Sequence, residues 1–140
     1  MIYEPREDSH LLLEQVKKYA KGKVIDIGTG SAIQAIAAAQ KRNVKSVLAV
    51  DIQKDVIRYC RKNIKHPKIS FRQSDLFSKV EGSFDTIVFN PPYLPEDLRA
   101  RDITLEGGKK GYEMIERFFH EAGKHLAPDG RILMVHSSFT

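Results

Sequence analysis

Residues 23–42, KVIDIGTGSAIQAIAAAQKR, place a short apolar segment, a pair of glycines and an alanine-rich segment in direct succession. The first part, residues 23–28, predicts a buried strand, because it is short, apolar and partly β-branched. The last part, residues 31–42, predicts a helix, because alanine is the strongest helix former. Gly28 and Gly30 lie between them and allow a tight backbone turn. A strand that turns directly into a helix is the repeating unit of α/β folds.

The same order continues along the chain. Further strands are predicted at residues 46–51, 68–73, 84–89 and 131–136, and further helices at about 11–19, at 54–64 and at 112–130, the last closed by Pro128 and Gly130. This alternation predicts an α/β fold of the Rossmann-like, doubly wound type, in which a mainly parallel sheet of about five strands has helices on both faces. Ligands of such folds bind beyond the carboxyl ends of the strands. Candidate site residues are therefore sought just after each strand.

The composition predicts one globular domain spanning residues 1–140. The chain is 41% hydrophobic and 29% charged, and no apolar run approaches the roughly 20 residues of a membrane span. The opening MIYEPREDSH lacks the apolar core of a secretory signal. Cys60 is the single cysteine, which fits a reducing cytoplasm and a small residue of the core. The five histidines form no metal-ligand spacing, so we expect no metal site.

The net charge of +5 permits an acidic partner without requiring one. The Lys and Arg residues between positions 41 and 72 alternate with apolar residues, which is more typical of a solvated helix face than of a nucleic-acid surface. The composition by itself leaves a nucleic-acid partner open.

Residues suited to ligand binding follow the first predicted strand. Gly28 and Gly30 let the backbone approach a ligand, but the dinucleotide pattern G-x-G-x-x-G needs a third glycine where this chain has Ile33. Asp26 places a carboxylate at the same point, which suits an ammonium group better than a pyrophosphate. The turn therefore favours a cationic ligand group over a dinucleotide.

Carboxylates also follow the second and third predicted strands. Asp51 comes 23 residues after Gly28, the spacing at which an acidic side chain accepts hydrogen bonds from ribose hydroxyls. Asp75 can accept a hydrogen bond from an adenine amino group, with Leu76 or Phe77 covering the ring. Together with Asp26, these carboxylates predict a ligand that has an adenosine and a cationic amino-acid end.

The fourth predicted strand, residues 84–89, ends in Asn90, Pro91, Pro92 and Tyr93. Prolines fix the backbone torsion φ and have no N–H group, so they stop the ladder and hold the following loop rigid. Carbonyl groups without a ladder partner can then point at an incoming ligand. Four such residues after a buried strand, downstream of three candidate ligand-binding motifs, favour a functional segment over an ordinary strand-terminating turn.

These motifs resemble a known family of enzymes. DIGTGSA, VDIQ, SDLF and NPPY, in that order, resemble the motifs of class I S-adenosylmethionine-dependent methyltransferases. The opening YEPREDSHLLLE, the NPPY and the later EGGKKG are similar to the release-factor glutamine methyltransferases of the HemK/PrmC-like family, in particular the short one-domain archaeal and eukaryotic members. The resemblance covers the whole chain.

The resemblance implies S-adenosyl-L-methionine as cofactor. The matching positions are Asp26, Gly28, Thr29, Gly30, Asp51, Ile52, Asp75, Leu76 and Asn90, with Tyr3 and Asp8 of the opening motif closing over the cofactor. An alternative for the opening motif is that Asp8 or Ser9 caps the following helix.

The reaction implied is N5-methylation of a glutamine side chain in a protein, such as a translation release factor with a Gly-Gly-Gln loop. Asn90 and the Pro91 carbonyl would hold the planar amide of the substrate, and Tyr93 would pack beside it. An amide nitrogen is a poor nucleophile, so positioning would drive the reaction more than a general base. Residues 94–111, which lack periodicity, are predicted to form a substrate loop.

Two other functions stay open. The NPPY motif is also similar to that of methyltransferases acting on the exocyclic amino group of adenine or guanine in RNA or DNA. A non-catalytic module that binds the cofactor or a partner is the second alternative. The resemblance also implies a small zinc-binding activator subunit, docked by strand addition near the third strand.

The sheet of the family continues with two more strands, which we do not expect in this chain. The strand at 131–136 would then be an apolar sheet edge. We therefore predict that the chain self-associates along this strand or needs another polypeptide for stability.

Overall fold

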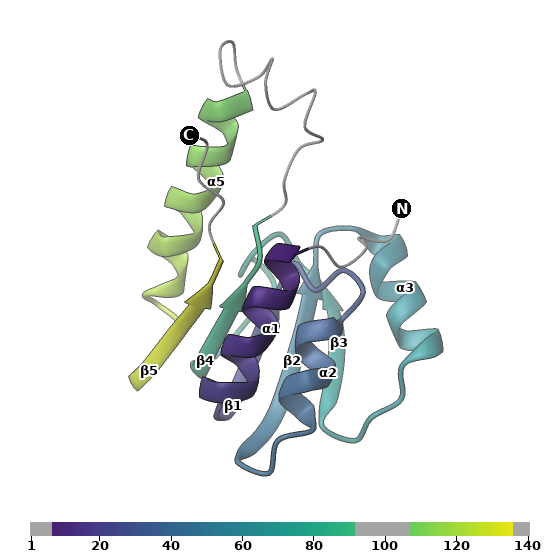
Figure 1. Ribbon diagram of the computed structural model, residues 1–140. Helices are drawn as coiled ribbons and strands as arrows, with labels where there is room; N and C mark the ends of the chain where they lie inside the picture. The colour runs from purple at the N-terminus through teal and green to yellow at the C-terminus, as the bar shows by residue number, and fades with distance from the viewer. Residues whose placement is uncertain (1–6, 92–106, 136–140) are drawn as a thin grey trace.

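The computed structural model describes residues 7–91 and 107–135. Its elements are α1 (Glu7–Tyr19), β1 (Gly22–Ile27), α2 (Ile33–Ala39), β2 (Val44–Asp51), α3 (Lys54–Asn63), β3 (Ile69–Gln73), β4 (Phe84–Phe89), α5 (Gly107–Ala122) and β5 (Leu126–Met134) (Figure 1). The predicted alternation of strands and helices is confirmed.

The five strands form one parallel sheet in the order β3-β2-β1-β4-β5. The order reverses at β1, because the chain proceeds from β1 to β2 and β3 on one side and then returns to place β4 on the other. Ile27 at the end of β1 lies opposite Phe89 at the end of β4. The loops that leave β1 and β4 therefore begin side by side, which is where ligands bind in doubly wound folds. The predicted Rossmann-like fold is confirmed.

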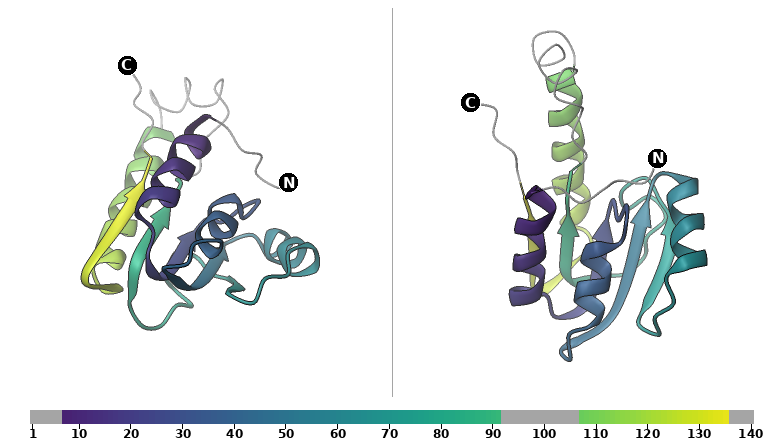
Figure 2. Two further views of the ribbon diagram at one scale, coloured as in Figure 1. Left: turned by 60° about the horizontal axis from the view of Figure 1, so that its bottom comes forward. Right: turned by 45° about the vertical axis from the view of Figure 1, so that its right-hand side comes forward.

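Helices cover both faces of the sheet, as predicted, but unequally. α1, α2 and α3 lie on one face and α5 lies on the other (Figure 2). Side chains of a strand alternate between faces. Val24 and Val88 accordingly pack against the three helices, whereas Ile25 and Ile87 pack beneath α5. Cys60 is fully buried in the first cluster, and this burial raises the pKa of its thiol to about 11, so the predicted core role is confirmed.

The prediction of a helix over residues 112–130 is wrong at both ends. The helix starts earlier, at Gly107, and it ends at Ala122. Residues 107–111 are helical where a loop was predicted, and residues 94–106 lie outside the described residues. Pro128 and Gly130 do not close the helix, because the chain enters β5 at Leu126.

Pairing with β4 explains this change. Phe84 N–H donates to the His125 carbonyl at 2.7 Å, and Leu126 lies opposite Phe84. Arg131 then lies opposite Thr86, so residues 127–130 bulge opposite the single residue Asp85. A Cβ atom at Gly130 would lie 2.8 Å from the Ala127 oxygen, so this bulge requires glycine. Such long-range pairing overrides a local Pro-Asp-Gly turn signal.

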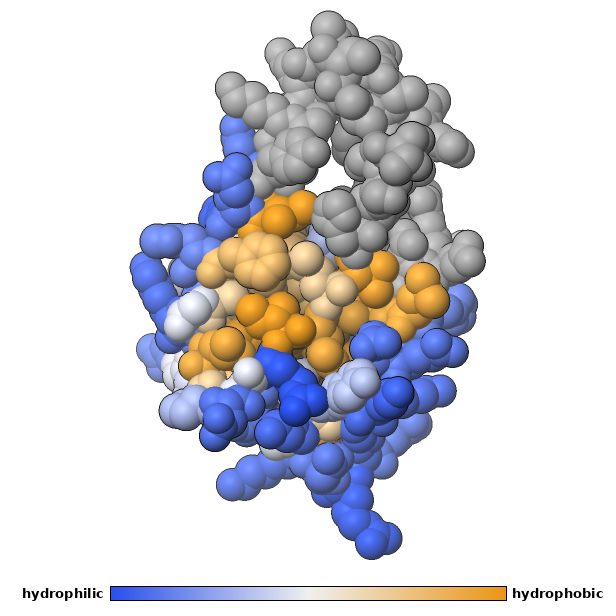
Figure 3. All heavy atoms as spheres, turned by 60° about the vertical axis from the view of Figure 1, so that its left-hand side comes forward, coloured by the Kyte–Doolittle hydropathy of each residue, from blue (hydrophilic) through white to orange (hydrophobic). Residues whose placement is uncertain are grey.

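Within the described part of the chain, β5 pairs with β4 alone and forms one edge of the sheet. Figure 3 shows hydrophobic side chains gathered on the side of the molecule that carries β5 and α5. Leu11 of the neighbouring α1 is 52% exposed and Phe119 of α5 is 47% exposed. Helices beside β5 therefore carry exposed apolar side chains, and self-association along β5 stays a prediction. No helix within residues 7–91 and 107–135 is long and apolar enough to cross a membrane.

Candidate functional site

The turn after β1 brings the predicted glycines to the carboxyl edge of the sheet. Gly28 and Gly30 have φ values of 71° and 54°, in the left-handed region that favours glycine. Thr29 N–H donates to the Val50 carbonyl at 2.8 Å, which ties the turn to β2. A Cβ atom at Gly28 would lie 3.8 Å from the Asn90 carbonyl oxygen. The turn after β1 thus faces the start of the NPPY segment.

Asp26 is a buried carboxylate with an unused oxygen. Its side chain is 1% exposed, and Oδ2 accepts a hydrogen bond from the Thr29 hydroxyl at 2.7 Å. Oδ1 is buried and has no hydrogen-bond partner among the described residues. Burial raises the pKa of the Asp26 carboxyl to about 7, the Thr29 hydrogen bond opposes this rise, and the Asp51 carboxylate adds to it. A cationic group placed here would stabilise the charged form.

Asp51 connects the loops after β1 and β2. Its Oδ2 accepts a hydrogen bond from Gly30 N–H at 3.0 Å, and its Oδ1 accepts one from Gln53 N–H at 2.9 Å. The side chain is buried, so its position is fixed by both loops. Ile52 follows directly and is 58% exposed, which makes it an apolar surface next to the buried carboxylates.

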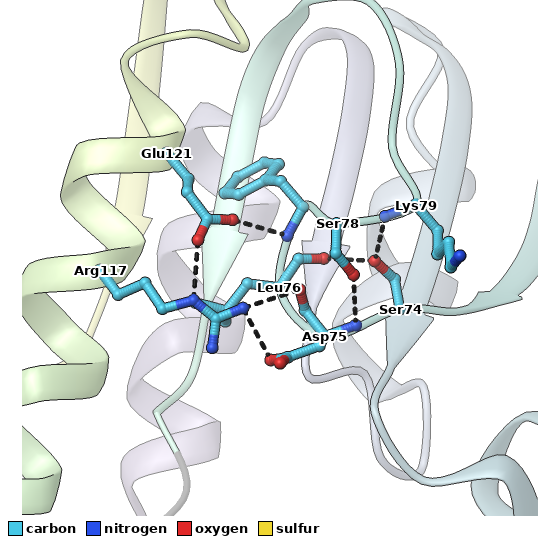
Figure 4. Close-up of polar contacts among 8 residues, drawn as sticks. Ser74, Asp75, Leu76, Ser78, Lys79, Arg117 and Glu121 are labelled. Carbon is cyan, nitrogen blue, oxygen red and sulfur yellow. Dashed lines mark hydrogen bonds and ion pairs between the residues drawn. The ribbon is translucent and has the colours of Figure 1, made fainter.

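The loop after β3 adds the third carboxylate. Ser74 N–H donates to the Asp51 carbonyl at 2.9 Å, so the loop begins beside β2. The Asp75 side chain is 45% exposed and contacts Arg117 of α5 (Figure 4). Leu76 and Phe77 are buried under α5, so neither offers an exposed side chain to cover a ring, and Leu76 can contribute its backbone. Ile52 is the exposed apolar side chain at this edge.

Asn90 starts the NPPY segment and is partly buried. Its side-chain Nδ2 donates to the Ser9 hydroxyl oxygen at 2.9 Å. Its Oδ1 is buried without a hydrogen-bond partner in residues 7–91 and 107–135. Pro91 is buried behind it, and Pro92 and Tyr93 lie outside the described residues. An amide with one end fixed and a free acceptor oxygen is suited to hold a group that donates N–H.

The opening motif contributes Ser9, which the sequence indicated only as a possible helix cap. α1 begins at Glu7, so Asp8 and Ser9 lie inside the helix, and the alternative that either caps it is wrong. Ser9 is fully buried, and its carbonyl accepts a hydrogen bond from the Gln34 side chain at 2.8 Å. Tyr3 and the Asp8 side chain lie outside the described residues. Only the contact with Asn90, 81 positions away, identifies Ser9 as part of the site.

The residues that the sequence predicts for the cofactor and for the acceptor form two groups, which we call the cofactor part and the acceptor part. The cofactor part consists of three carboxylates and a glycine turn, from Asp26, Gly28–Gly30, Asp51 and Asp75, and its chemistry fits a ligand with an ammonium group, hydroxyls and an amino group. The acceptor part consists of Asn90 with its support Ser9. No three His, Cys, Asp or Glu side chains of the described ranges gather in a way that could hold a metal ion.

Comparisons with known proteins give consistent results. The model of the family described as the methyltransferase small domain matches residues 6–140. A protein of Methanocaldococcus jannaschii, named as a candidate protein N5-glutamine methyltransferase, is 39% identical over 99% of this chain and 74% of its own length. The release factor glutamine methyltransferase of Lactococcus lactis is 32% identical over 93% of this chain, which spans 54% of that protein.

A solved structure has the same fold. The ribosomal protein L11 methylase of Lactobacillus delbrueckii subsp. bulgaricus superimposes with a TM-score of 0.69 at 26% identity, covering 96% of this chain and 62% of that protein. These three proteins are named for methyl transfer to proteins, and the lactococcal enzyme and the L11 methylase are considerably longer than this chain.

Proposed function

The chain belongs to the methyltransferase small domain family, and on this premise we propose that it transfers the methyl group of S-adenosylmethionine to the side-chain amide nitrogen of a protein glutamine. The observation that carries this proposal is the Asn90 side chain, which Ser9 holds at Nδ2 and whose buried Oδ1 lacks a partner among the described residues. The names of the archaeal and lactococcal relatives support glutamine as the acceptor. We further propose a translation release factor with a Gly-Gly-Gln loop as the substrate.

The described residues fit the proposed cofactor. Oδ1 of Asp26 would receive the ammonium group, and Asp51 would accept hydrogen bonds from ribose hydroxyls. Asp75 would accept from the adenine amino group, beside Ile52 and the Leu76 backbone. Gly28, Thr29 and Gly30 allow close approach of the backbone, and Tyr3 and Asp8 belong to the proposal as residues that close over the cofactor. The bound cofactor supplies a methyl group on a positively charged sulfur.

Asn90 would position the acceptor. Its Oδ1 accepts one N–H of the glutamine amide, and the Pro91 carbonyl accepts the other, with Pro92 and Tyr93 completing this part of the site. Holding the nitrogen about 3 Å from the methyl carbon and in line with the breaking bond is the main contribution a protein can make to this transfer. A new N–C bond forms as the S–C bond breaks, and the nitrogen loses one proton to solvent.

A second candidate acceptor is the exocyclic amino group of a nucleic-acid base. The net charge of +5 favours this alternative, and such a nitrogen is also planar and conjugated. Glutamine is preferred because the two curated relatives compared above are named for it. A small zinc-binding activator subunit, which the family resemblance implies, is a further part of the proposal. A cytoplasmic location is another, and it rests on the single cysteine, Cys60.

Methyl transfer from labelled S-adenosylmethionine tests the proposal. The acceptors are a release factor with a Gly-Gly-Gln loop, its Gln→Ala variant in that loop, and bulk RNA, each with and without an added zinc-binding subunit. We expect label in the first acceptor and none in the variant. Label in RNA alone would identify the amino group of a nucleic-acid base as the acceptor. The absence of label from every acceptor would favour a non-catalytic module.

A further inference from the structure

Arg117 of α5 reaches across to the loop after β3 (Figure 4). Its Nη2 lies 3.0 Å from Oδ1 of Asp75 and 3.2 Å from the Asp75 carbonyl oxygen. Its Nε donates to Oε2 of Glu121, one turn further along the helix, at 2.8 Å. A planar guanidinium that is fixed by Glu121 on one side presents its remaining N–H groups to Asp75 in a defined direction.

Glu121 makes a second connection between α5 and the loop after β3. Its Oε1 accepts a hydrogen bond from Phe77 N–H at 3.2 Å, while Oε2 holds Arg117. The Phe77 ring stacks on His125 with 4.7 Å between centroids and packs beside Phe118. α5 therefore fixes the loop on both sides of Leu76.

The backbone at Asp75 is held as well. Asp75 N–H donates to the Ser78 hydroxyl oxygen at 3.2 Å, and the Asp75 carbonyl accepts from Ser78 N–H at 3.0 Å. The Ser74 hydroxyl donates to the Leu76 carbonyl at 2.7 Å. With the backbone fixed, the direction of the carboxylate depends on its side-chain torsions, and Arg117 fixes these by holding Oδ1.

Oδ2 of Asp75 makes no hydrogen bond to any described residue, and the side chain is 45% exposed. We propose that Arg117 is a positioning residue that directs Oδ2 of Asp75 toward the adenine amino group, so that α5 takes part in selecting adenine over other bases. This inference rests on the proposed function, which places adenine at Asp75. An exposed ion pair adds little to the stability of a fold, but a carboxylate with a fixed direction discriminates between a ligand that has a donor and one that lacks it.

Calorimetry with two ligands tests this inference. S-adenosylhomocysteine carries the adenine amino group, and S-inosylhomocysteine has a carbonyl oxygen in its place. We expect the wild-type chain to prefer the first by about tenfold or more, as hydrogen bonds to a charged group allow. Arg117→Gln should reduce this preference to within about threefold. Arg117→Lys, which keeps a cation beside Asp75 but cannot bridge to Glu121 with the same fork, should recover part of it.

The matched control is Arg58→Gln, which removes an exposed ion pair with Asp55 on α3, at 3.5 Å, and should leave the preference unchanged. If Arg117→Gln lowers the unfolding midpoint but weakens both ligands equally, Arg117 only supports the fold and the inference is overturned. If the wild type binds both ligands equally, the assignment of adenine to Asp75 fails and the inference fails with it. If neither ligand binds, the proposed function itself is wrong.

Discussion

The cofactor part and the acceptor part of the site lie at the same edge of the sheet but are built differently. In the cofactor part, two contacts join residues that are near in the chain, Thr29 with Asp26 and Gln53 with Asp51. Longer contacts join Gly30 to Asp51 across 21 positions and Arg117 to Asp75 across 42. In the acceptor part, Asn90 is held by Ser9 from 81 positions away. The two short contacts need only their own loops, whereas the contact of Asn90 with Ser9 needs α1 to be packed on the sheet.

The two parts also differ in the charge of their side chains. Asp26 and Asp51 are buried carboxylates, which suit a cation or hydroxyl donors, and under the proposed function they set the affinity for the cofactor. Asn90 is neutral, and under the proposed function its Oδ1, which has no partner among the described residues, orients the acceptor more than it adds to binding strength. Substitution of Asp26 or Asp51 should therefore change the dissociation constant of the cofactor, and substitution of Asn90 should change the turnover rate.

The largest effect is expected for Asn90→Ala. The rate of methyl transfer should fall on the order of 10³-fold, because the acceptor loses its positioning group, while the affinity for S-adenosylhomocysteine changes only a few-fold. Asn90→Asp should be nearly as harmful, since a carboxylate cannot donate to Ser9. Asn63→Ala on the exposed end of α3 is the control. Steady-state kinetics with calorimetry separates the two quantities, and normal turnover in both Asn90 variants would place the acceptor part elsewhere.

In the absence of ligand, Asp26→Asn should stabilise the fold by an amount that increases with pH. The folded pKa of about 7 is above the ordinary 3.8, so wild type is most stable when Asp26 is protonated. Part of this stability is lost as the pH rises from about 4 through 7, because the unfolded chain ionises first. The asparagine cannot ionise. Its gain in the free energy of unfolding should grow from near zero at pH 4 to roughly 2–4 kcal/mol at pH 8.

Urea unfolding at both pH values measures this gain. The control is Asp55→Asn, whose side chain is 85% exposed in wild type and should give a flat difference. The same Asp26→Asn protein should bind S-adenosylhomocysteine more weakly, because the ammonium group loses its charged partner. A difference in stability that does not depend on pH would show that burial does not control this carboxyl.

Asp51→Ala should weaken cofactor binding by about 1.5–3 kcal/mol, the contribution of a hydrogen bond to a charged group. The variant also releases Gly30 and Gln53, so the loops after β1 and β2 lose their connection. Turnover at saturating cofactor should change much less than the dissociation constant. Calorimetry that shows unchanged affinity, or tighter binding of NAD than of the methyl donor, would contradict the cofactor assignment.

Ser9→Ala should lower the turnover rate about tenfold, with the dissociation constant of the cofactor unchanged, because Asn90 loses its support. Ser9→Thr keeps the hydroxyl and should restore part of the rate. In an Asn90→Ala background, Ser9→Ala should have no further effect, since the two residues act together. Additive losses in the double variant would mean that Ser9 acts through the packing of α1 alone.

The smallest effect concerns the sheet edge. Leu133 is 8% exposed and belongs to the core, so Leu133→Lys would unfold the chain and cannot test the edge. Phe119→Lys changes an exposed residue of the flanking helix and should weaken self-association by about 1 kcal/mol. Tyr59→Lys on α3 is the control, since Tyr59 is 48% exposed. Light scattering that shows a stable monomer at high concentration, without a partner, would contradict the predicted self-association along β5.

Much of the fold was predictable because its signals are local. Each predicted strand exists in the described residues, and the family and its methyl donor, predicted from four short motifs, are confirmed. The prediction that the helix extends to residue 130 was wrong, because Pro128 and Gly130 are compatible with either a helix stop or a bulge in a strand. Pairing of Leu126 with Phe84 decided between them.

The order of strands and helices, the glycine turn after β1 and the carboxylates near the ends of three strands follow from the amino-acid sequence, because hydrophobic period, turn residues and motif spacing depend on neighbouring positions. The packing of the folded chain sets which distant side chains meet. It joined Ser9 to Asn90 and Arg117 to Asp75, it buried Phe77 under α5, and it left Oδ1 of Asp26 without a partner in the described residues. Burial and direction are properties of packed elements, and residues 42 or 81 positions apart leave no common pattern in the sequence.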